Sequence, residues 1–280
     1  MIWNIVTDSS CDLDPADVRR GETAVHYTSV PFILTVEDRE FIDDDSLNRE
    51  ELLDTMEMSR EASRSACPSP HTWEAAFRQE GPVVAITISK ELSGSYNSAC
   101  VARETVLESD PGKQIVIVNS ASAGAGLVCL LRAITEEILA GHDFDTVAAK
   151  AHEFSDRMKT IFALCSFDNL VKNGRMSKIV GFIARSLGFW GIGIATPEGR
   201  IAIKGKERST RKVIAAVLED IRKNGRPARL MISHCQNLDM AERLRTAIVE
   251  TWPEVRVEIS DTKGLCSYYA ERHGLIMAYL

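Results

Sequence analysis

Short apolar runs alternate with longer segments of helical spacing through the first half of the chain. The apolar runs predict buried strands at Ile2–Thr7, Val30–Val36, Val83–Ile88 and Ile115–Val118. Helical spacing predicts helices over Ser46–Met58, Ser95–Glu108 and Leu127–Ala140, and Ser46 is the expected N-cap of the first. This alternation predicts a doubly wound, mostly parallel sheet, in which ligands bind beyond the carboxyl ends of the strands.

A polar helix over Asp145–Lys159 and a new strand at Ile161–Cys165 mark the expected change of domain, giving domains of residues 1–158 and 159–280. Further strands are predicted at Gly191–Ala195, Arg200–Lys206, Arg229–Ser233 and Val255–Ile259. Helices are predicted over Ser209–Asn224 and Leu238–Thr251. Because Pro197-Glu198-Gly199 forms a tight turn between two strands, we expect an antiparallel hairpin there and a mixed sheet with helices in the second domain. The fold class is therefore α/β with two domains.

Composition narrows the class of protein. The chain has 280 residues, of which 45% are hydrophobic and 26% charged, as in an ordinary globular protein. The formal net charge of -7 argues against nucleic acid as a partner. The apolar stretch Ile179–Ile194 is too short to span a bilayer and contains Arg185, so we expect no stable membrane insertion. Seven cysteines without a CxxC pair, and a start that lacks a secretory signal, predict reduced thiols in a cytoplasmic protein, expected to be a monomer.

No motif for a metal or cofactor stands out. The six histidines are isolated, and none has metal-ligand spacing with a cysteine or carboxylate. The run Asp43-Asp44-Asp45 could bind a cation, but a solvated loop that caps the next helix is the simpler interpretation. The loop Ser120–Gly126 lacks the G-x-G-x-x-G spacing, so it is interpreted as a tight strand-to-helix turn. We therefore expect neither a metal nor a cofactor.

Two polar segments carry the candidate chemistry. Ser93-Gly94-Ser95 follows a strand and opens a helix, where free amides and hydroxyls can hold an anion. Asn173-Gly174-Arg175 offers a sharp turn and a guanidinium that can bind an oxygen anion in a forked geometry, although Arg175 could also pair with a surface acid. Asp8, at the end of the first strand, is expected to bond to loop amides with its neighbouring serines.

These segments together resemble the DegV family of bacterial lipid-binding proteins. The resemblance rests on the motifs Ile5–Ser10, Ile88–Tyr96, Val118–Ser120, Leu170–Ser177 and Lys206–Arg208. It implies a two-domain fold with a long-chain fatty acid between the domains and its carboxylate at Ser93, beside Gly94 and Ser95. It further implies that Ser65 supplies a second hydroxyl, that Arg175 is the family's arginine, and that a separate fatty acid kinase phosphorylates the bound carboxylate.

The sequence departs from the family pattern at three places. Ala66 and Cys67 replace a serine and a glutamine, and Trp190-Gly191 stands in place of Lys-Pro. Ala270–Gly274 replaces the family's His-Thr-Gly-Pro-Gly, although His273 lies three residues beyond the expected histidine. The last departure affects the head-group end and therefore the kinase-linked role.

The acyl chain requires an apolar slot. Phe182, Leu187 and Phe189 are candidates to line it, although an ordinary core helix would explain the same residues. The leading hypothesis is thus a fatty acid carrier without catalytic residues of its own. Two alternatives stay open: a sensor or regulatory module for another small anion, and a hydrolase or phosphotransferase that uses Asp8, Ser93 and Arg175, which would require a base near Ser93.

Overall fold

The first sheet of the molecule is entirely parallel. The computed structural model describes residues 2–14, 25–59, 61, 63–176 and 188–280. Four strands pair in the order β2-β1-β6-β7, with bounds Trp3–Asp8 (β1), Val25–Val30 (β2), Val83–Thr87 (β6) and Ile115–Asn119 (β7). All three pairings are parallel, which confirms the prediction for the first half.

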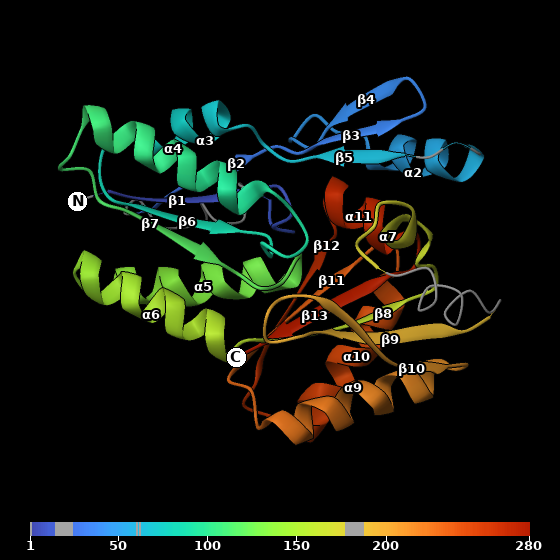
Figure 1. Cartoon of the computed structure of the whole chain (residues 1–280). Helices are drawn as coiled ribbons and strands as arrows, with labels where there is room; N and C mark the ends of the chain where they lie inside the picture. Colours follow the sequence, from blue (N-terminus) through green and yellow to red (C-terminus); the bar gives the residue numbers. More distant parts are fainter. Residues whose placement is uncertain (1, 15–24, 60, 62, 177–187) are drawn as a thin grey trace.

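Helices cover both faces of this sheet (Figure 1). On one face lie α3 (Pro70–Phe77) and α4 (Ser95–Ser109), which bury Trp73, Phe77 and Val106 against the strands. On the other lie α5 (Ala125–Leu139) and α6 (Phe144–Arg157). The strands are apolar on both faces because both faces are covered.

The second sheet is mixed and has the strand order β10-β9-β8-β13-β11-β12. Its strands are Lys159–Leu164 (β8), Trp190–Ala195 (β9), Ile201–Glu207 (β10), Arg229–His234 (β11), Arg256–Asp261 (β12) and Leu275–Tyr279 (β13). The predicted hairpin is confirmed, since β9 and β10 pair antiparallel around the turn at 196–200. The outer face is covered by α9 (Thr210–Asn224) and α10 (Leu238–Thr251).

Helix α5 lies between the two sheets. Every residue from Ala125 to Leu131 is buried, and the helix packs on β1 and β6 as well as on β11 and β13. Met231 and Ala278 of the second sheet belong to the same apolar cluster as the leucines of α5. The first two turns of α5 are apolar around the whole circumference and have to be enclosed on all sides, and the two sheets enclose them.

A small third sheet corrects one prediction. The predicted strand Val30–Val36 is two strands in different sheets, because Pro31 has no N–H with which to continue the ladder. The antiparallel sheet β4-β3-β5 consists of Ile33–Val36 (β3), Arg39–Ile42 (β4) and Arg64–Ala66 (β5). It packs beside α2 (Arg49–Met58), α7 (Asp168–Lys172) and α11 (Gly264–Ala270).

The acidic run before α2 also differs from its prediction. Asn48, not Ser46, caps α2, because the hydroxyl of Ser46 donates to Asp44 Oδ1 at 2.6 Å and the side chain of Asn48 accepts from Glu51 N. Asp43 is buried and accepts from the amides of Gly264 and Leu265, at 2.8 Å each. The run therefore fixes the start of α11 in the second half of the chain.

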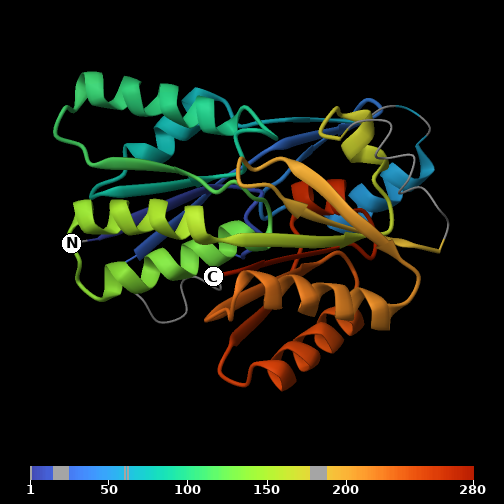
Figure 2. The ribbon, with the colours of Figure 1, turned by 60° about the horizontal axis from the view of Figure 1, so that its bottom comes forward.

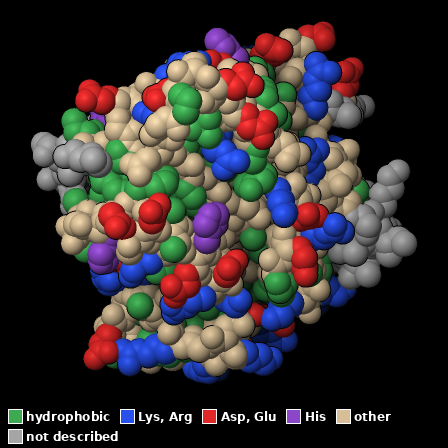
Figure 3. All heavy atoms as spheres, turned by 60° about the vertical axis from the view of Figure 1, so that its left-hand side comes forward, with side chains coloured by type: hydrophobic (Ala, Val, Ile, Leu, Met, Phe, Trp, Pro, Cys, Tyr) green, Lys and Arg blue, Asp and Glu red, His purple; other side chains and the backbone are tan. Residues whose placement is uncertain are grey.

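The two halves also meet at the turn of the β9–β10 hairpin, which Figure 2 shows reaching the first sheet. There Ser89 Oγ donates to the carbonyl of Gly199 at 2.7 Å. Acidic and basic side chains are intermixed over the face seen in Figure 3. None of the described helices combines the length and apolar character that crossing a membrane requires.

Candidate functional site

A narrow cavity lies between the two sheets, at the carboxyl ends of the first sheet's strands. The loop after β6 contributes Ile88, Leu92 and Ser93, and the loop after β7 contributes Ala121, Ser122 and Ala123. The second half contributes strands β8, β9, β10 and β13 and helix α11. The remaining lining residues are Phe32, Ser65, Thr160, Phe162, Leu164, Leu170, Arg175, Ala195, Gly199, Arg200, Ile201, Leu265, Cys266, Tyr269, Ala270 and Ile276.

Strand β8 forms the apolar wall of the cavity. Thr160, Phe162 and Leu164 all face the cavity, whereas Ile161 and Ala163 pack on the opposite side against α9 and α10. Alternate side chains of a strand point to opposite faces, so three residues two apart line a stretch of about 13 Å. The wall is therefore long and apolar, as an extended hydrocarbon chain requires.

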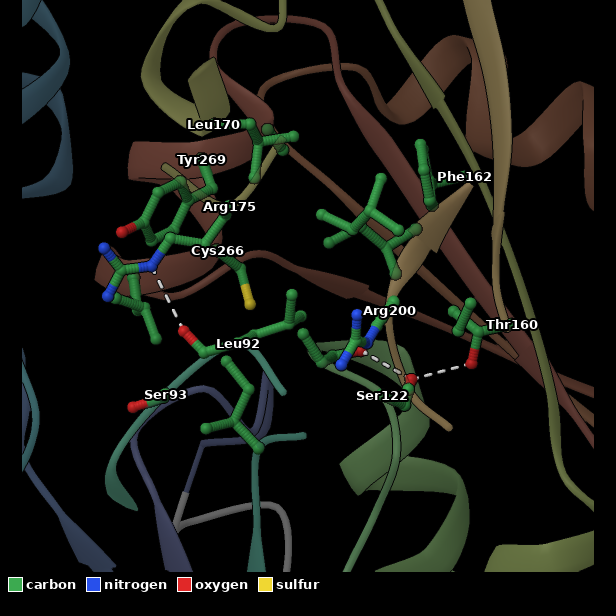
Figure 4. A pocket seen from close by; sticks show the side chains of 18 of the residues that line it. Leu92, Ser93, Ser122, Thr160, Phe162, Leu170, Arg175, Arg200, Cys266 and Tyr269 are labelled. Atoms are coloured by element: carbon green, nitrogen blue, oxygen red, sulfur yellow. Dashed lines mark hydrogen bonds between the residues drawn. The ribbon is translucent and has the colours of Figure 1, made fainter. Parts of the chain in front are cut away.

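Polar side chains gather at one end of the cavity. Figure 4 shows Ser93, Arg175 and Tyr269 near one another, on the side away from Thr160. Ser65, on β5, shares a hydrogen bond of 2.7 Å with the Tyr269 hydroxyl. Burial raises the pKa of Tyr269, so its phenol keeps its proton and can act as a hydrogen-bond donor.

Arg175 provides positive charge at this end. It follows α7, where Gly174 turns the chain with a φ of +73°, a conformation that glycine adopts readily. Its Nε donates to the carbonyl of Leu92 at 3.1 Å and its Nη1 to that of Asn173 at 2.6 Å. The described lining residues include no carboxylate, and the other arginine, Arg200, pairs with Glu91 at 2.7 Å. The Arg175 charge is thus available to an anionic ligand.

Asp8 holds the serine loop in place. Its carboxylate accepts from Ile88 N at 2.9 Å, Ser95 Oγ at 2.7 Å and Ser10 Oγ at 2.5 Å. Burial raises the pKa of Asp8, and these hydrogen bonds act in the opposite direction. The Ser95 hydroxyl is directed at Asp8, and Gly94 is exposed. Neither residue is among the described residues that line the cavity. Ser93 does line it, and its Oγ accepts from Ser95 N at 3.3 Å.

Of the three residues predicted to line the acyl slot, the structure describes only Phe189. Phe182 and Leu187 lie outside the described residues. Phe189 lies beneath the cations of Lys206 and Arg208, at 5.1 and 4.5 Å from its ring centre, and does not line the described cavity. The sequence analysis did not name the cavity-lining residues of β8, although Phe162 and Leu164 alternate within the predicted strand Ile161–Cys165 and Thr160 directly precedes it.

The segment that departs from the family pattern borders the head-group end. Ala270 lines the cavity, whereas His273 is exposed. Tyr269, which sequence reasoning also missed, supplies the hydroxyl at this end. The described lining residues include no histidine, aspartate or glutamate. The geometry suits the binding of an anionic head with an apolar tail.

Comparison with known proteins gives the family. The family described as "Uncharacterised protein, DegV family" matches residues 2–276. A DegV domain-containing protein of Streptococcus pyogenes is 36% identical over 280 residues, which are 100% of this chain and 99% of that protein.

Solved structures agree with that match. The Fatty Acid Kinase (Fak) B3 protein of Streptococcus pneumoniae, loaded with linoleic acid, is 34% identical, with a TM-score of 0.94 and coverage of 100% of this chain and 99% of that one. A DegV family protein of Eubacterium eligens, loaded with heptadecanoic acid, is 29% identical, with a TM-score of 0.93 and coverage of 99% of both chains. The chain therefore belongs to the DegV family.

Proposed function

We propose that this protein binds a long-chain fatty acid, with the carboxylate at Arg175, Ser65, Ser93 and Tyr269 and the acyl chain along β8. The observation that carries the proposal is an apolar slot that ends at one arginine and three hydroxyls, with no carboxylate among its described lining residues. The fatty acids held by the Streptococcus pneumoniae and Eubacterium eligens relatives support it. Residues 1–158 and 159–280 would then form two domains that enclose the ligand.

The two ends of the ligand would contribute differently to binding. Burial of a methylene gains about 0.8 kcal/mol, so about fifteen methylenes supply roughly 12 kcal/mol before ordering costs. A buried carboxylate without donors would cost several kcal/mol, which the arginine and the hydroxyls offset. The tail therefore provides affinity, and the head selects an acid over a neutral lipid.

The protein would act as a carrier without turnover of its own. The absence of a candidate base among the described lining residues supports this, as does the likeness to a protein described as a Fak B3 protein. A separate kinase would phosphorylate the presented carboxylate. A closed tail slot would protect the resulting acyl phosphate from water.

Mass spectrometry of the purified protein, native and then after organic extraction, tests the proposal. We expect a stoichiometric fatty acid, or stoichiometric uptake of one that is added to delipidated protein. Protein that takes up no fatty acid but is stabilised by a water-soluble anion would instead support the sensor hypothesis. Turnover of acyl or phosphoryl esters that Ser93→Ala abolishes would support the enzyme hypothesis.

Arg175→Met and Arg200→Met form a matched pair for the head-group assignment, because both arginines line the cavity but only Arg200 is already paired with an acid. Loss of a charge-assisted hydrogen bond should weaken fatty acid binding at least about tenfold in Arg175→Met. Arg200→Met should stay within about threefold of the wild type. A fatty alcohol of equal length should bind the wild type and Arg175→Met alike; equal losses for acid and alcohol would refute the charge assignment.

A further inference from the structure

Two hydroxyls lie at the end of the cavity opposite Arg175 (Figure 4). Ser122, in the loop after β7, and Thr160, on β8, share a hydrogen bond of 2.7 Å and are both buried (Figure 4). Both side chains line the cavity, and they come from different halves of the molecule. They lie at the far end of the slot, where Arg200 is also drawn beside Ser122 (Figure 4).

A second hollow lies directly behind this end. Ala121, Thr160 and Ala195 line both the cavity and the second hollow. The second hollow is otherwise lined by residues such as Met158, Lys159, Pro197 and Lys204, which do not line the cavity. These three shared residues therefore form the partition between the two spaces.

The partition is held by close backbone packing. A Cβ on Gly126 of α5 would lie 2.1 Å from Ser122 Oγ, so glycine there allows Ser122 to pack on the helix. A Cβ on Gly199 would lie 2.9 Å from the Cα of Ala121, so the turn of the β9–β10 hairpin packs closely against the other side of the loop after β7. Of the three residues that line both spaces, Ala121 and Ala195 have only a methyl side chain, so Thr160 is the one whose truncation would open the partition most.

We propose that Thr160 is the residue that sets the longest acyl chain this protein accepts. The inference rests on the proposed function, since it takes the head to lie at Arg175 and the tail to run along β8 toward Thr160. A chain that fits ends at the methyl group of Thr160. Each longer chain must displace the wall or bend, and therefore gains no further affinity.

The test is a binding series of saturated fatty acids of increasing length, with competition between lengths read by mass spectrometry. In the wild type, affinity should rise with length and then level off or fall. Thr160→Ala should move this limit to longer chains, with roughly fourfold tighter binding for each methylene that newly fits. Thr160→Val keeps the volume and removes only the hydroxyl, so its limit should stay at that of the wild type.

Ala195→Leu adds volume to the same partition and should move the limit to shorter chains, which keeps the proposal testable if Thr160→Ala does not fold. A Thr160→Ala protein that binds stoichiometrically with the wild-type length limit would overturn the inference and leave the proposed function intact. A Thr160→Val protein whose length limit moves as far as that of Thr160→Ala would also overturn the inference. Failure of the wild type to bind any fatty acid would instead refute the proposed function.

Discussion

Asp12 is a buried carboxyl outside the cavity. Its Oδ1 accepts from Lys263 N at 2.7 Å, but within the described part of the chain its Oδ2 has no hydrogen-bond partner. Burial raises its pKa from 3.8 to about 7. A group with a raised folded-state pKa holds its proton in the folded protein over a pH range in which the unfolded chain has lost it. The contribution of Asp12 to stability should therefore fall as the pH rises from 3.8 to about 7, and then stay level.

Asp12→Asn removes this titration while its side-chain carbonyl can still accept from Lys263 N. We expect the variant to gain stability relative to the wild type as the pH rises through this window, by up to about 4 kcal/mol above pH 7. Urea unfolding of both proteins at several pH values measures the difference. Burial also raises the pKa of Asp43, to about 6. Because Asp43 is present in both proteins, its titration affects both stabilities and does not account for the difference between them. A stability difference that does not change with pH would show that Asp12 does not titrate in this range.

Ser93 and Ser95 are neighbours with separate roles. Ser93→Ala removes a hydroxyl from the cavity and should weaken fatty acid binding several-fold, with little change in stability. Ser95→Ala removes a donor from buried Asp8 and should lower the free energy of unfolding by about 1–3 kcal/mol. Thermal melts and binding titrations of both variants separate the effects, and the reverse pattern would contradict the placement of the two side chains.

Residue types in the sequence indicated an anion site, but not which neighbour each side chain contacts. The motif at 93–95 contains two serines, and nothing in the sequence shows that one of them is directed at Asp8, 87 residues away. The pairing of Ser65 with Tyr269 spans 204 residues. Such contacts depend on how the sheets assemble, so reasoning from the sequence named Ser93 and Arg175, which line the cavity, but missed Tyr269.

At the scale of elements, strands and helices with regular patterns were predicted well. Helix α10 has the predicted bounds Leu238–Thr251, β6 and β7 each differ from their predictions by one residue at one end, and β1 is shifted by one residue at both ends. Short elements such as β5, α7 and α11 were missed, because three to seven residues carry too little periodicity to recognise. Strand β13 was missed although it is apolar, since it follows an irregular segment in which Glu271 and His273 have positive φ.

Helix α5 depends on glycine at position 126. Gly126→Ala would bring a Cβ within 2.1 Å of Ser122 Oγ and 2.5 Å of Ser122 Cβ. We expect a loss of about 1–3 kcal/mol in the free energy of unfolding, as for other overpacked sites. Gly205→Ala is the matched control, because a Cβ there meets no atom within 4 Å. Chemical denaturation measures the free energy of unfolding of both variants. Equal values would show that the loop at Ser122 can move to accept the added Cβ at little cost.

On the scale of the whole molecule, the proposed ligand would contact both halves at once. A ligand that binds only the folded state stabilises it by about 2.7 kcal/mol at a hundred times its Kd. We expect a matching rise in Tm with added fatty acid, and slower amide exchange on both sides of the cavity, in β8 and in the loop after β6. Hydrogen exchange with mass spectrometry measures this. Protection confined to one half would contradict a ligand placed between the sheets.

The position of α5 also bears on whether either half could exist alone. A cut at residue 158 falls between the strands of the two sheets, yet it would leave α5 with one half of its surroundings and expose its leucines on the side of Met231 and Ala278. Large exposed apolar patches of this kind lead to aggregation. The isolated fragments should therefore be insoluble when produced separately and should recover a soluble fold only when co-expressed, so that the two proposed domains would depend on each other to fold.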